Sequence, residues 1–395
     1  MIPSLEYIRE TASLIEKYVN KTPVIRSLYL SSLSNAEVLM KLENMQVTGS
    51  FKARGAFSKI LRNLEKARSN GVIAASTGNH GQAVAYASTT LGAKATIVMP
   101  TTAPQLKINR IRYFGGDVLL HGEIFDDAAK KAIELAKKEN KVFVHPFDDP
   151  DVIAGQGTIG LEISEYHPDI VIVPVGGGGL ISGIALAIKS ISKNTKVIGV
   201  QSEKFPHAYA NRKASRGEQI GSIGKYRGGF ILADGIAVKE PGEITTRIIE
   251  EYVDDFVLVS DEEIFDAIYI ASKRDKIIAE GAGAAPIAAL LSGKIDVEGK
   301  RVMLIISGGN IDPPVLNEAI IRGLKKDERL FELKFRGPSE ALKVLIEHHA
   351  LMIDSCIRKL PGYGSLFSGY VALGSKEDFK SLIEDLKKHG CEIFE

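Results

Sequence analysis

The stretch DIVIVPVGGGGLISGIALAIKSISK, from Asp169 to Lys193, decides the fold class of this chain. It begins as an apolar, β-branched strand, continues through the glycine run Gly176–Gly179 and ends as an apolar helix. No residue from Ile170 to Ile188 is charged, which is typical of a membrane span. However, Pro174 and the glycines interrupt the middle of the run. We therefore expect a buried strand, a glycine loop and a buried helix, and no membrane partner.

The same alternation of strand and helix continues on both sides of this stretch. We expect strands at 38–43, 72–76, 94–99, 117–122, 141–147, 169–175, 195–201, 254–260 and 301–307. We expect helices at 50–67, 81–92, 104–115, 125–140, 157–167, 179–193, 261–276, 281–294 and 312–326, with an irregular segment at 205–242. Short buried strands separated by helices of crossover length predict an α/β fold, in which parallel sheets are flanked by helices.

The C-terminal part of the chain has a different pattern. The charged segment KKDER, Lys325 to Arg329, is interpreted as a linker. Residues 330–395 then follow the order strand, helix, strand, strand, helix, strand, which predicts a ferredoxin-like α+β domain.

Composition restricts the class of function. The chain has 395 residues, of which 45% are hydrophobic, and a formal net charge of +1. This length allows two or three domains, and the near-zero charge argues against nucleic acid or an anionic membrane as the main partner. The two cysteines, Cys356 and Cys391, have neither the spacing of metal ligands nor that of a disulfide framework. The N-terminus is amphipathic and lacks the apolar core of a signal peptide, so we expect a cytoplasmic protein.

The segment TGSFKARGAF, Thr48 to Phe57, places a lysine at a helix start. Ser50 is expected to cap that helix, which puts Lys52 in its first turn. The positive end of the helix dipole and burial both favour the neutral amine there. A neutral amine reacts with carbonyl groups, whereas a solvated lysine is the plainer alternative. Arg54 has no evident role in this pattern.

Three further segments follow expected strands. STGNHGQA, from Ser76, offers Asn79 and free N–H groups for an anion at a helix start, while a lone histidine such as His80 is more often structural. The glycine run suits a phosphate but matches neither the P-loop nor the dinucleotide fingerprint. Ser307, in LIISGGNID, is placed to bond a ring nitrogen; Glu280 is interpreted as a helix-start carboxylate. An imine-forming lysine, a phosphate loop and a ring-nitrogen partner together indicate pyridoxal 5'-phosphate.

Taken together, the motifs TGSFKARGA, ASTGNHGQAVA, PVGGGGLISG, LADGIAV, AEGAGAA and SGGN resemble those of the fold-type II pyridoxal-phosphate enzymes, and among them the threonine/serine dehydratase family. The resemblance covers roughly residues 1–325. It implies a two-lobed catalytic domain over 1–325, with a smaller lobe at about 50–148 that closes over the substrate. It also implies a C-terminal ACT-like regulatory domain at 330–395, a homo-oligomer (dimer or tetramer) and a role in amino-acid metabolism that includes isoleucine biosynthesis.

The resemblance also assigns roles to residues. The implied cofactor-binding residues are Lys52, which forms the Schiff base, Phe51, Asn79 at the ring hydroxyl, Gly176, Gly177, Gly178, Gly179 and Leu180 at the phosphate, and Ser307 at the ring nitrogen. The implied receivers of the substrate carboxylate are Ser76, Thr77, Gly78 and His80. The implied reaction is conversion of L-threonine to 2-oxobutanoate and ammonia, with Lys52 removing the α-proton and L-serine as a second substrate.

Two departures from the family pattern and several alternatives stand beside this prediction. Gln201 occupies the place where similar serine racemases have a metal-binding glutamate, so we expect no metal site of that kind. FRGPSEAL replaces the DRPG turn of ACT domains, which weakens the prediction of an amino-acid effector there. The alternatives are a serine dehydratase, a serine racemase, a threonine synthase and, from another class, a non-catalytic amino-acid sensor.

Overall fold

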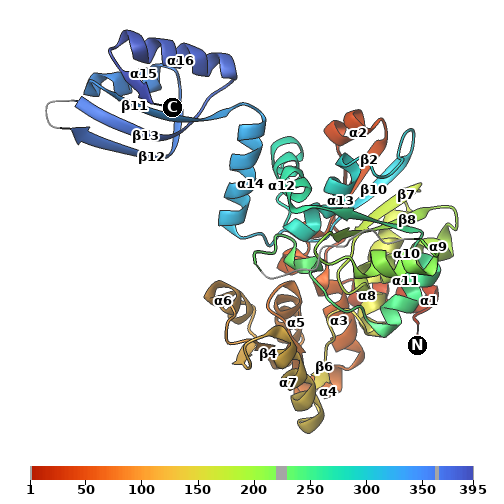
Figure 1. Ribbon diagram of the computed structural model, residues 1–395. Helices are drawn as coiled ribbons and strands as arrows, with labels where there is room; N and C mark the ends of the chain where they lie inside the picture. Colours follow the sequence, from red (N-terminus) through yellow and green to blue (C-terminus); the bar gives the residue numbers. More distant parts are fainter. Residues whose placement is uncertain (1, 219–228, 361–363, 395) are drawn as a thin grey trace. The chain divides into compact units, whose positions relative to one another are not determined.

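The computed structural model describes residues 2–218, 229–360 and 364–394 and divides the chain into two compact units, Met1–Asp312 and Pro313–Glu395 (Figure 1). The first unit contains two sheets and the second contains one. Each unit is described by itself below.

The larger sheet of the first unit has six strands in the order β1-β2-β10-β7-β8-β9. The strands are β1 (Val24–Arg26), β2 (Glu37–Leu42), β7 (Ile170–Pro174), β8 (Lys196–Ser202), β9 (Asp255–Val259) and β10 (Arg301–Ile306). Only the β1–β2 pair is antiparallel among the pairs of this sheet. A mainly parallel sheet must be covered on both faces, which explains why its strands are apolar without alternation.

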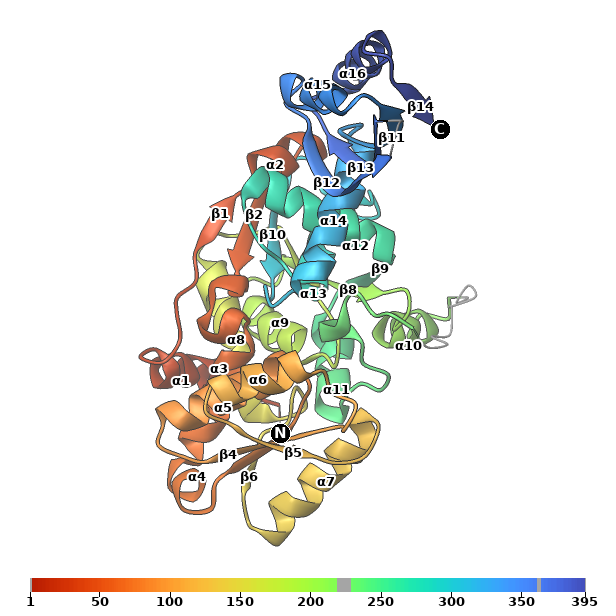
Figure 2. The same ribbon diagram turned by 90° about the vertical axis from the view of Figure 1, so that its left-hand side faces the viewer.

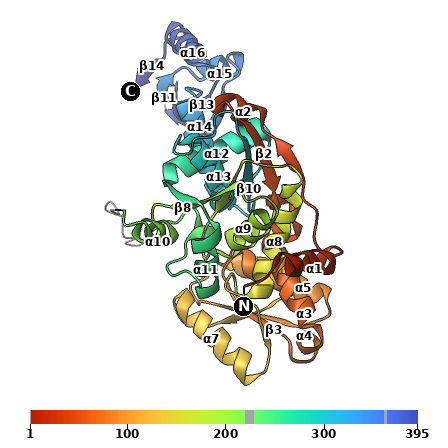
Figure 3. The ribbon, with the colours of Figure 1, turned by 90° about the vertical axis from the view of Figure 1, so that its right-hand side faces the viewer.

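Helices cover both faces of this sheet (Figure 3). On one face α8 (Pro150–Ser164) and α9 (Gly179–Ile191) bury their apolar side chains against β7 and β10. On the other face α13 (Gly281–Leu291) packs on β7, β8, β9 and β10, and α12 (Asp261–Ile270) packs against α13. The unit also holds α1 (Leu5–Ile15), α2 (Leu28–Ser34), α10 (His207–Ser215) and α11 (Glu243–Tyr252). Among the described residues no helix is both long and apolar enough to cross a membrane.

The smaller sheet is entirely parallel, in the order β5-β4-β3-β6. Its strands are β3 (Val72–Ala75), β4 (Ala95–Met99), β5 (Asp117–Leu120) and β6 (Val142–Phe143). Alternate residues of β3 face opposite sides: Val72 and Ala74 pack in the core formed with α3 (Lys52–Arg62) and α5 (Asn79–Thr90), whereas Ile73 and Ala75 pack against α7 (Phe125–Lys138). Figure 2 shows α5 and α6 (Gln105–Tyr113) apart from α7, with β4 and β5 between them.

Strand order places the loops that carry the motifs. In the larger sheet the chain runs from β7 through α9 to β8 on one side, while β10 lies on the other side of β7. In the smaller sheet β3 continues to β4 on one side and β6 lies on the other. Ligands of open α/β sheets bind at the carboxyl ends of strands where the order reverses in this way. These two points are where the glycine run and the STGNHG loop leave β7 and β3.

The second unit has the expected order of elements. After α14 (Pro313–Lys326) come β11 (Leu330–Gly337), η5 (Ser339–Ala341), α15 (Leu342–Glu347), β12 (Leu351–Leu360), β13 (Gly364–Ala372), α16 (Lys376–Lys388) and β14 (Glu392–Phe394). The sheet is antiparallel, in the order β12-β13-β11-β14. The segment expected as a linker, Lys325–Arg329, overlaps the end of α14, so only Asp327 to Arg329 connect α14 to β11.

Several local predictions were wrong. The helix expected at 50–67 is two helices, α3 and α4 (Leu64–Asn70), which are separated at Asn63. Ser50 does not cap α3, because it is extended, forms a bridge with Gly308 and is followed by Phe51 at the cap position. Four helices have no counterpart among the expected ones: α1, α2, α10 and α11. Of these, α10 lies in the segment taken as irregular, and residues 219–228 of that segment lie outside the described residues.

Helices α3 and α8 approach each other at glycine. A Cβ built on Gly155 would lie 2.6 Å from the carbonyl oxygen of Arg54 and 2.6 Å from the Cα of Gly55. Both neighbours are backbone atoms and cannot turn away, so the helices would have to separate.

We therefore expect Gly155→Ala to lower the free energy of unfolding by about 1–3 kcal/mol, the usual range for overpacking a core. Thermal and urea unfolding followed by circular dichroism measure this. Ser164→Ala, near the end of the same helix, is the matched control, and equal stability of the two variants would contradict the close contact.

Candidate active site

Three neighbouring strands of the larger sheet end at the same edge and lead to three of the predicted segments. β2 leads through η1 (Glu43–Met45) and η2 (Val47–Gly49) to Lys52, β10 leads to Ser307, and β7 leads to the glycine loop. Since β2, β10 and β7 are adjacent and parallel, the lysine, the serine and the glycines belong to one edge.

Backbone hydrogen bonds fasten the Lys52 segment to the end of β10. The Phe51 N–H donates to the Ser307 carbonyl oxygen at 3.1 Å, and the Gly309 N–H donates to the Gly49 carbonyl oxygen at 3.0 Å. The turn before them has two successive left-handed residues, Thr48 at φ 65° and Gly49 at φ 75°. Glycine adopts this conformation without strain, which explains TGS ahead of Phe51. Lys52 is therefore held beside Ser307.

The Lys52 amine is half-buried and has one acceptor. Its Nζ donates to the carbonyl oxygen of Pro146 at 2.7 Å and lies 5.1 Å from the centre of the Phe51 ring. Burial lowers the pKa of Lys52 to about 8, and the carboxyl group of Glu280 partly opposes that shift. About a tenth of the amine is therefore neutral and nucleophilic at pH 7, far more than of an ordinary lysine.

Asn79 is the first residue of α5, and two neighbours fix its amide. Its Nδ2 donates to Glu280 Oε1 at 2.7 Å, and its Oδ1 accepts from Asn310 Nδ2 at 2.8 Å. Asn310 also donates to the Thr48 carbonyl oxygen at 2.8 Å. The second Nδ2 hydrogen of Asn79 is left for a ligand oxygen. The sequence did not assign a role to Asn310, although it directly follows the glycines of SGGN.

Glu280 is more than a carboxylate at a helix start. It is 7% exposed, its N–H donates to the Gly308 carbonyl oxygen at 3.0 Å, and burial raises its pKa to about 7. It thus links α13 to the end of β10 and to Asn79.

His80 is buried, and its side chain is part of the smaller lobe's structure. Its Nε2 lies 2.9 Å from the carbonyl oxygen of Val144 and donates to it. Burial and the nearby charge of Lys52 lower the pKa of His80 to about 3, so the imidazole is neutral at physiological pH. Only its main-chain N–H, in the first turn of α5, is placed to receive an anion.

The rest of the STGNHG loop leaves room for a ligand. The Gly78 N–H donates to Ser76 Oγ at 3.1 Å, which shapes the turn before α5. A Cβ built on Gly78 would meet no atom within 4 Å, so open space lies in front of it. Thr77 beside it is half-buried. This loop can accept a carboxylate at the start of α5.

The glycine loop ends in a helix N-terminus with unused donors. The first hydrogen bond of α9 runs from the Ser182 N–H to the Gly178 carbonyl oxygen at 2.9 Å. The N–H groups of Gly179, Leu180 and Ile181 precede it and are available to an anion. Gly178 has φ 92°, so a side chain there would be strained.

The segment HPFDD at 145–149 contacts both Lys52 and the glycine loop; the sequence analysis wrongly placed 145–147 in a strand, which ends at Phe143. The Pro146 carbonyl oxygen accepts from the Lys52 amine. The Phe147 ring occupies the space beside Gly177, where a Cβ built on Gly177 would lie 2.3 Å from the ring. Asp148 accepts from the first N–H groups of α11, and Asp149 caps α8. His145 Nδ1 accepts the Asp148 N–H at 2.7 Å. The segment 145–149 follows a strand and is rich in capping residues, and this was the sequence signal that could have identified it.

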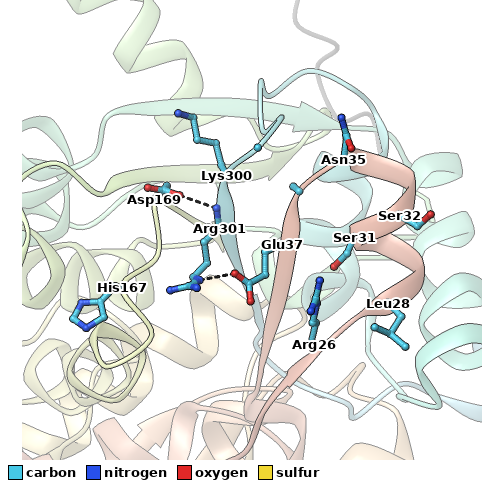
Figure 4. Close-up of a pocket in the computed structure, with 12 residues that line it drawn as sticks. Arg26, Leu28, Ser31, Ser32, Asn35, Glu37, His167, Asp169, Lys300 and Arg301 are labelled. Atoms are coloured by element: carbon cyan, nitrogen blue, oxygen red, sulfur yellow. Dashed lines mark hydrogen bonds and ion pairs between the residues drawn. The ribbon is translucent and has the colours of Figure 1, made fainter.

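The opposite edge of the larger sheet carries a separate hollow of about 710 Å³ (Figure 4). It lies at the amino ends of β2 and β10. The Arg301 guanidinium there forms an ion pair with Glu37 Oε2 at 2.7 Å, and the main-chain N–H of Arg301 donates to Asp169 Oδ2 at 2.7 Å. None of the predicted site residues lines this hollow.

The side chain of Gln201, at the position compared above with a metal-binding glutamate, has a structural role. Gln201 is buried, and its Oε1 accepts the Tyr209 N–H at 2.9 Å. Within the described residues, no group of three or more His, Cys, Asp or Glu side chains is placed to hold a metal ion.

An open α/β sheet with a nucleophilic lysine, a phosphate-type helix start and an amide donor at one edge defines a site for a phosphorylated aldehyde. Pyridoxal phosphate fits these donors: an aldehyde for Lys52, a phosphate for α9 and a ring oxygen for Asn79. The buried Ser50 Oγ, which has no partner among the described residues, lies beside this site.

The chain belongs to the family of pyridoxal-phosphate-dependent enzymes, whose family model matches residues 15–308. It is 49% identical over 328 residues to the L-threonine ammonia-lyase of Thermotoga maritima, which covers 82% of this chain and 80% of that one. It is 46% identical over 329 residues to a catabolic L-threonine dehydratase of Staphylococcus aureus, which covers 82% of this chain and 93% of that one.

Solved structures agree on the fold. The T.th. threonine deaminase superposes with a TM-score of 0.71 at 38% identity, over 78% of this chain and 99% of that one. The serine racemase of maize superposes with a TM-score of 0.74 at 30% identity, over 82% of this chain and 99% of that one. The family and its cofactor, predicted from the sequence, are confirmed.

The lowered pKa of Lys52 predicts a pH dependence. In cofactor-free protein, acylation of Lys52 should rise as the amine loses its proton, with a midpoint at about pH 8. In Glu280→Gln the midpoint should fall further, because the carboxylate that favours the ammonium is removed. Peptide mass analysis after labelling at a series of pH values measures both. A midpoint near the ordinary lysine value of 10.5 would contradict the burial of the amine.

The fixed amide of Asn79 predicts a second effect. Asn79→Ala removes a donor to the ring oxygen, so the absorbance maximum of bound pyridoxal phosphate should shift and its affinity should fall about tenfold, the loss expected for one hydrogen bond to a charged group. Spectra during cofactor titration measure both. Asn109→Ala, on the exposed helix α6, is the control, and identical spectra for all three proteins would exclude the contact.

Proposed function

We propose that this chain is a threonine ammonia-lyase, which converts L-threonine to 2-oxobutanoate and ammonia and also accepts L-serine. The observation that carries the proposal is the half-buried Lys52 amine, held by backbone bonds beside Ser307 at the edge that also presents the α9 N-terminus. The similarity to L-threonine ammonia-lyase over most of the chain supports the same substrate class. The relatives with a catabolic name favour a degradative role over isoleucine biosynthesis.

In this proposal the residues divide into three groups. The cofactor, when bound, supplies a ring that withdraws electrons from the substrate's α-carbon. Its contacts are Lys52, Phe51, Asn79, Gly176, Gly177, Gly178, Gly179, Leu180 and Ser307. The substrate carboxylate lies at Ser76, Thr77, Gly78 and the N–H of His80.

Lys52 performs the proton transfer in this proposal. A lysine with a pKa of about 8 offers a neutral Nζ that can take the α-proton and so become an ammonium, while the β-hydroxyl takes up a proton and leaves as water. The carbonyl oxygen of Pro146, 2.7 Å from Nζ, stabilises the protonated amine. Ser307 is a neutral partner for the ring nitrogen, which favours β-elimination over transamination because it does not hold a proton there.

We further propose that residues 1–325 form the catalytic domain, with a smaller lobe at about 50–148, and that residues 330–395 form an ACT-like regulatory domain for an amino-acid effector. The antiparallel sheet and the βαββαβ order of the second unit support this assignment. We propose a cytoplasmic homo-oligomer, a dimer or tetramer, with no nucleic-acid or membrane partner.

The proposed function is tested with the holoenzyme. L-Threonine should yield 2-oxobutanoate and ammonia, L-serine should yield pyruvate more slowly, and Lys52→Ala should lose at least about a thousandfold in rate, as expected when a covalent catalyst is removed. A 2-oxo acid assay measures this, with Lys66→Ala on the exposed helix α4 as control. D-Serine formation without 2-oxo acid would indicate a racemase instead, and threonine formed from O-phosphohomoserine a synthase. A protein that binds threonine without turnover would be a sensor.

A further inference from the structure

Arg54 lies two residues after Lys52, and the proposed reaction gives it no role. It is one of the two largest side chains that are fully buried, together with Lys41, and each is 1% exposed. Arginine and lysine are almost never fully buried unless they are paired. The partners of these two cations therefore show what Arg54 does.

Arg54 is bound on two sides by carboxylates. Its Nε and Nη2 donate to the two oxygens of Glu43 at 2.9 and 2.8 Å. Its Nη1 and Nη2 donate to the two oxygens of Glu162 at 2.6 and 3.2 Å, and Nη1 also donates to Thr158 Oγ1 at 3.0 Å. All three guanidinium nitrogens are thus bonded, in the bidentate geometry that lysine cannot reproduce.

Lys41 completes a neutral cluster of two cations and two carboxylates. Its Nζ donates to Glu162 Oε2 at 2.5 Å and to the Thr22 carbonyl oxygen at 2.5 Å. Burial opposes ionisation of Glu43, but the Arg54 guanidinium overcomes it and lowers the pKa of that carboxyl group. The formal charges of the cluster Lys41–Glu43–Arg54–Glu162 compensate one another.

The cluster joins three elements around the Lys52 segment. Glu43 directly follows β2 and Arg54 lies in the first turn of α3, so their pairing closes the loop that carries Lys52. Glu162 and Thr158 lie on α8, which packs on the larger sheet and meets the backbone of α3 at Gly155. Farther along, α3 enters the core of the smaller lobe through Phe57 and Ile60. The cluster thus holds the first turn of α3 to the larger sheet, where Ser307 lies.

We propose that Arg54, through Glu43 and Glu162, is a positioning residue for Lys52, which keeps the amine in register with the Ser307 edge. This inference rests on the proposed role of Lys52. The pairing does not touch the reacting atoms; it fixes the Cα from which the lysine side chain extends. A displacement of the order of 1 Å at a reacting group slows a reaction by about a hundredfold. The test therefore compares a reaction that depends on the position of the Lys52 amine relative to the Ser307 edge with a reaction that does not.

Removing Arg54 alone would leave the Glu43 carboxylate buried with only the Thr22 hydroxyl as a hydrogen-bond partner, which is strongly destabilising, so the main variant replaces both residues. Glu43→Met with Arg54→Met keeps the Lys41–Glu162 pair and the net charge, and such exchanges are often neutral for stability. Arg54→Lys keeps the charge but loses the bidentate geometry. Arg62→Met is the control on the same helix, since Arg62 is 22% exposed and 3.8 Å from Asp151, outside the cluster.

Each variant is measured in two reactions of cofactor-free protein. Pyridoxal phosphate, bound through its phosphate, reacts with Lys52 only in the correct register, and absorbance follows its rate. Propanal with cyanoborohydride alkylates the same amine without a binding site, and peptide mass gives its rate at Lys52. We expect the double variant and Arg54→Lys to react with pyridoxal phosphate at least about tenfold more slowly than the wild type. Their rates with propanal should be unchanged. Arg62→Met should react at the wild-type rate in both reactions.

The results separate the alternatives. If the folded variants react with pyridoxal phosphate at the wild-type rate, Arg54 does not position Lys52. An equal fall in both reactions would also overturn the positioning role, because it indicates a general loss of structure. If the double variant does not fold, Arg54→Lys alone decides. Two results would contradict the proposed function and not the positioning role. In one, pyridoxal phosphate does not attach to Lys52 in the wild type; in the other, the Lys52→Ala variant binds it covalently to the same extent as the wild type.

Discussion

The hydrogen bond from the Phe51 N–H to the Ser307 carbonyl oxygen, 3.1 Å long, joins the two segments on which the site depends. It extends the pairing of β2 and β10 beyond the ends of the strands, and the Gly309–Gly49 bond continues it. Lys52 follows Phe51, so main-chain hydrogen bonds hold the start of its segment, and the cluster around Arg54 holds the first turn of α3 that follows. The left-handed turn at Thr48 and Gly49 is needed for this pairing, and Asn310 supports it from the side.

Burial controls the chemistry of this edge. It lowers the pKa of Lys52 to about 8 and raises that of Glu280 to about 7, so both groups move toward their neutral forms. The sequence argument attributed the neutral lysine to the helix start and to burial together, and the structure gives burial as the main cause. Asn79 and the α9 N–H groups add neutral donors around the amine. An anionic ligand at this edge therefore meets neutral donors of the chain.

The sequence was sufficient for the fold class because its strands are buried on both faces and its helices alternate with them. The Gly176–Gly179 run was informative since four successive glycines exceed what a turn needs. Contacts between residues far apart in the sequence could not be predicted. Nothing in the sequence near Arg54 indicates that Glu43 and Glu162 pair with it. The neutral His80 and the Phe147 ring against Gly177 depend on packing of segments far apart in the chain. Ser50 was misread because a cap and an extended bridge look alike in sequence.

The most direct test of the account is to identify the residue that carries the cofactor. Holoenzyme reduced with borohydride and digested should give one peptide with a stable pyridoxyl mass, and fragmentation should place that mass on Lys52. The label on any other lysine, such as the nearby Lys59 or the buried Lys41, or no covalent label in a protein that retains activity, would contradict the central claim.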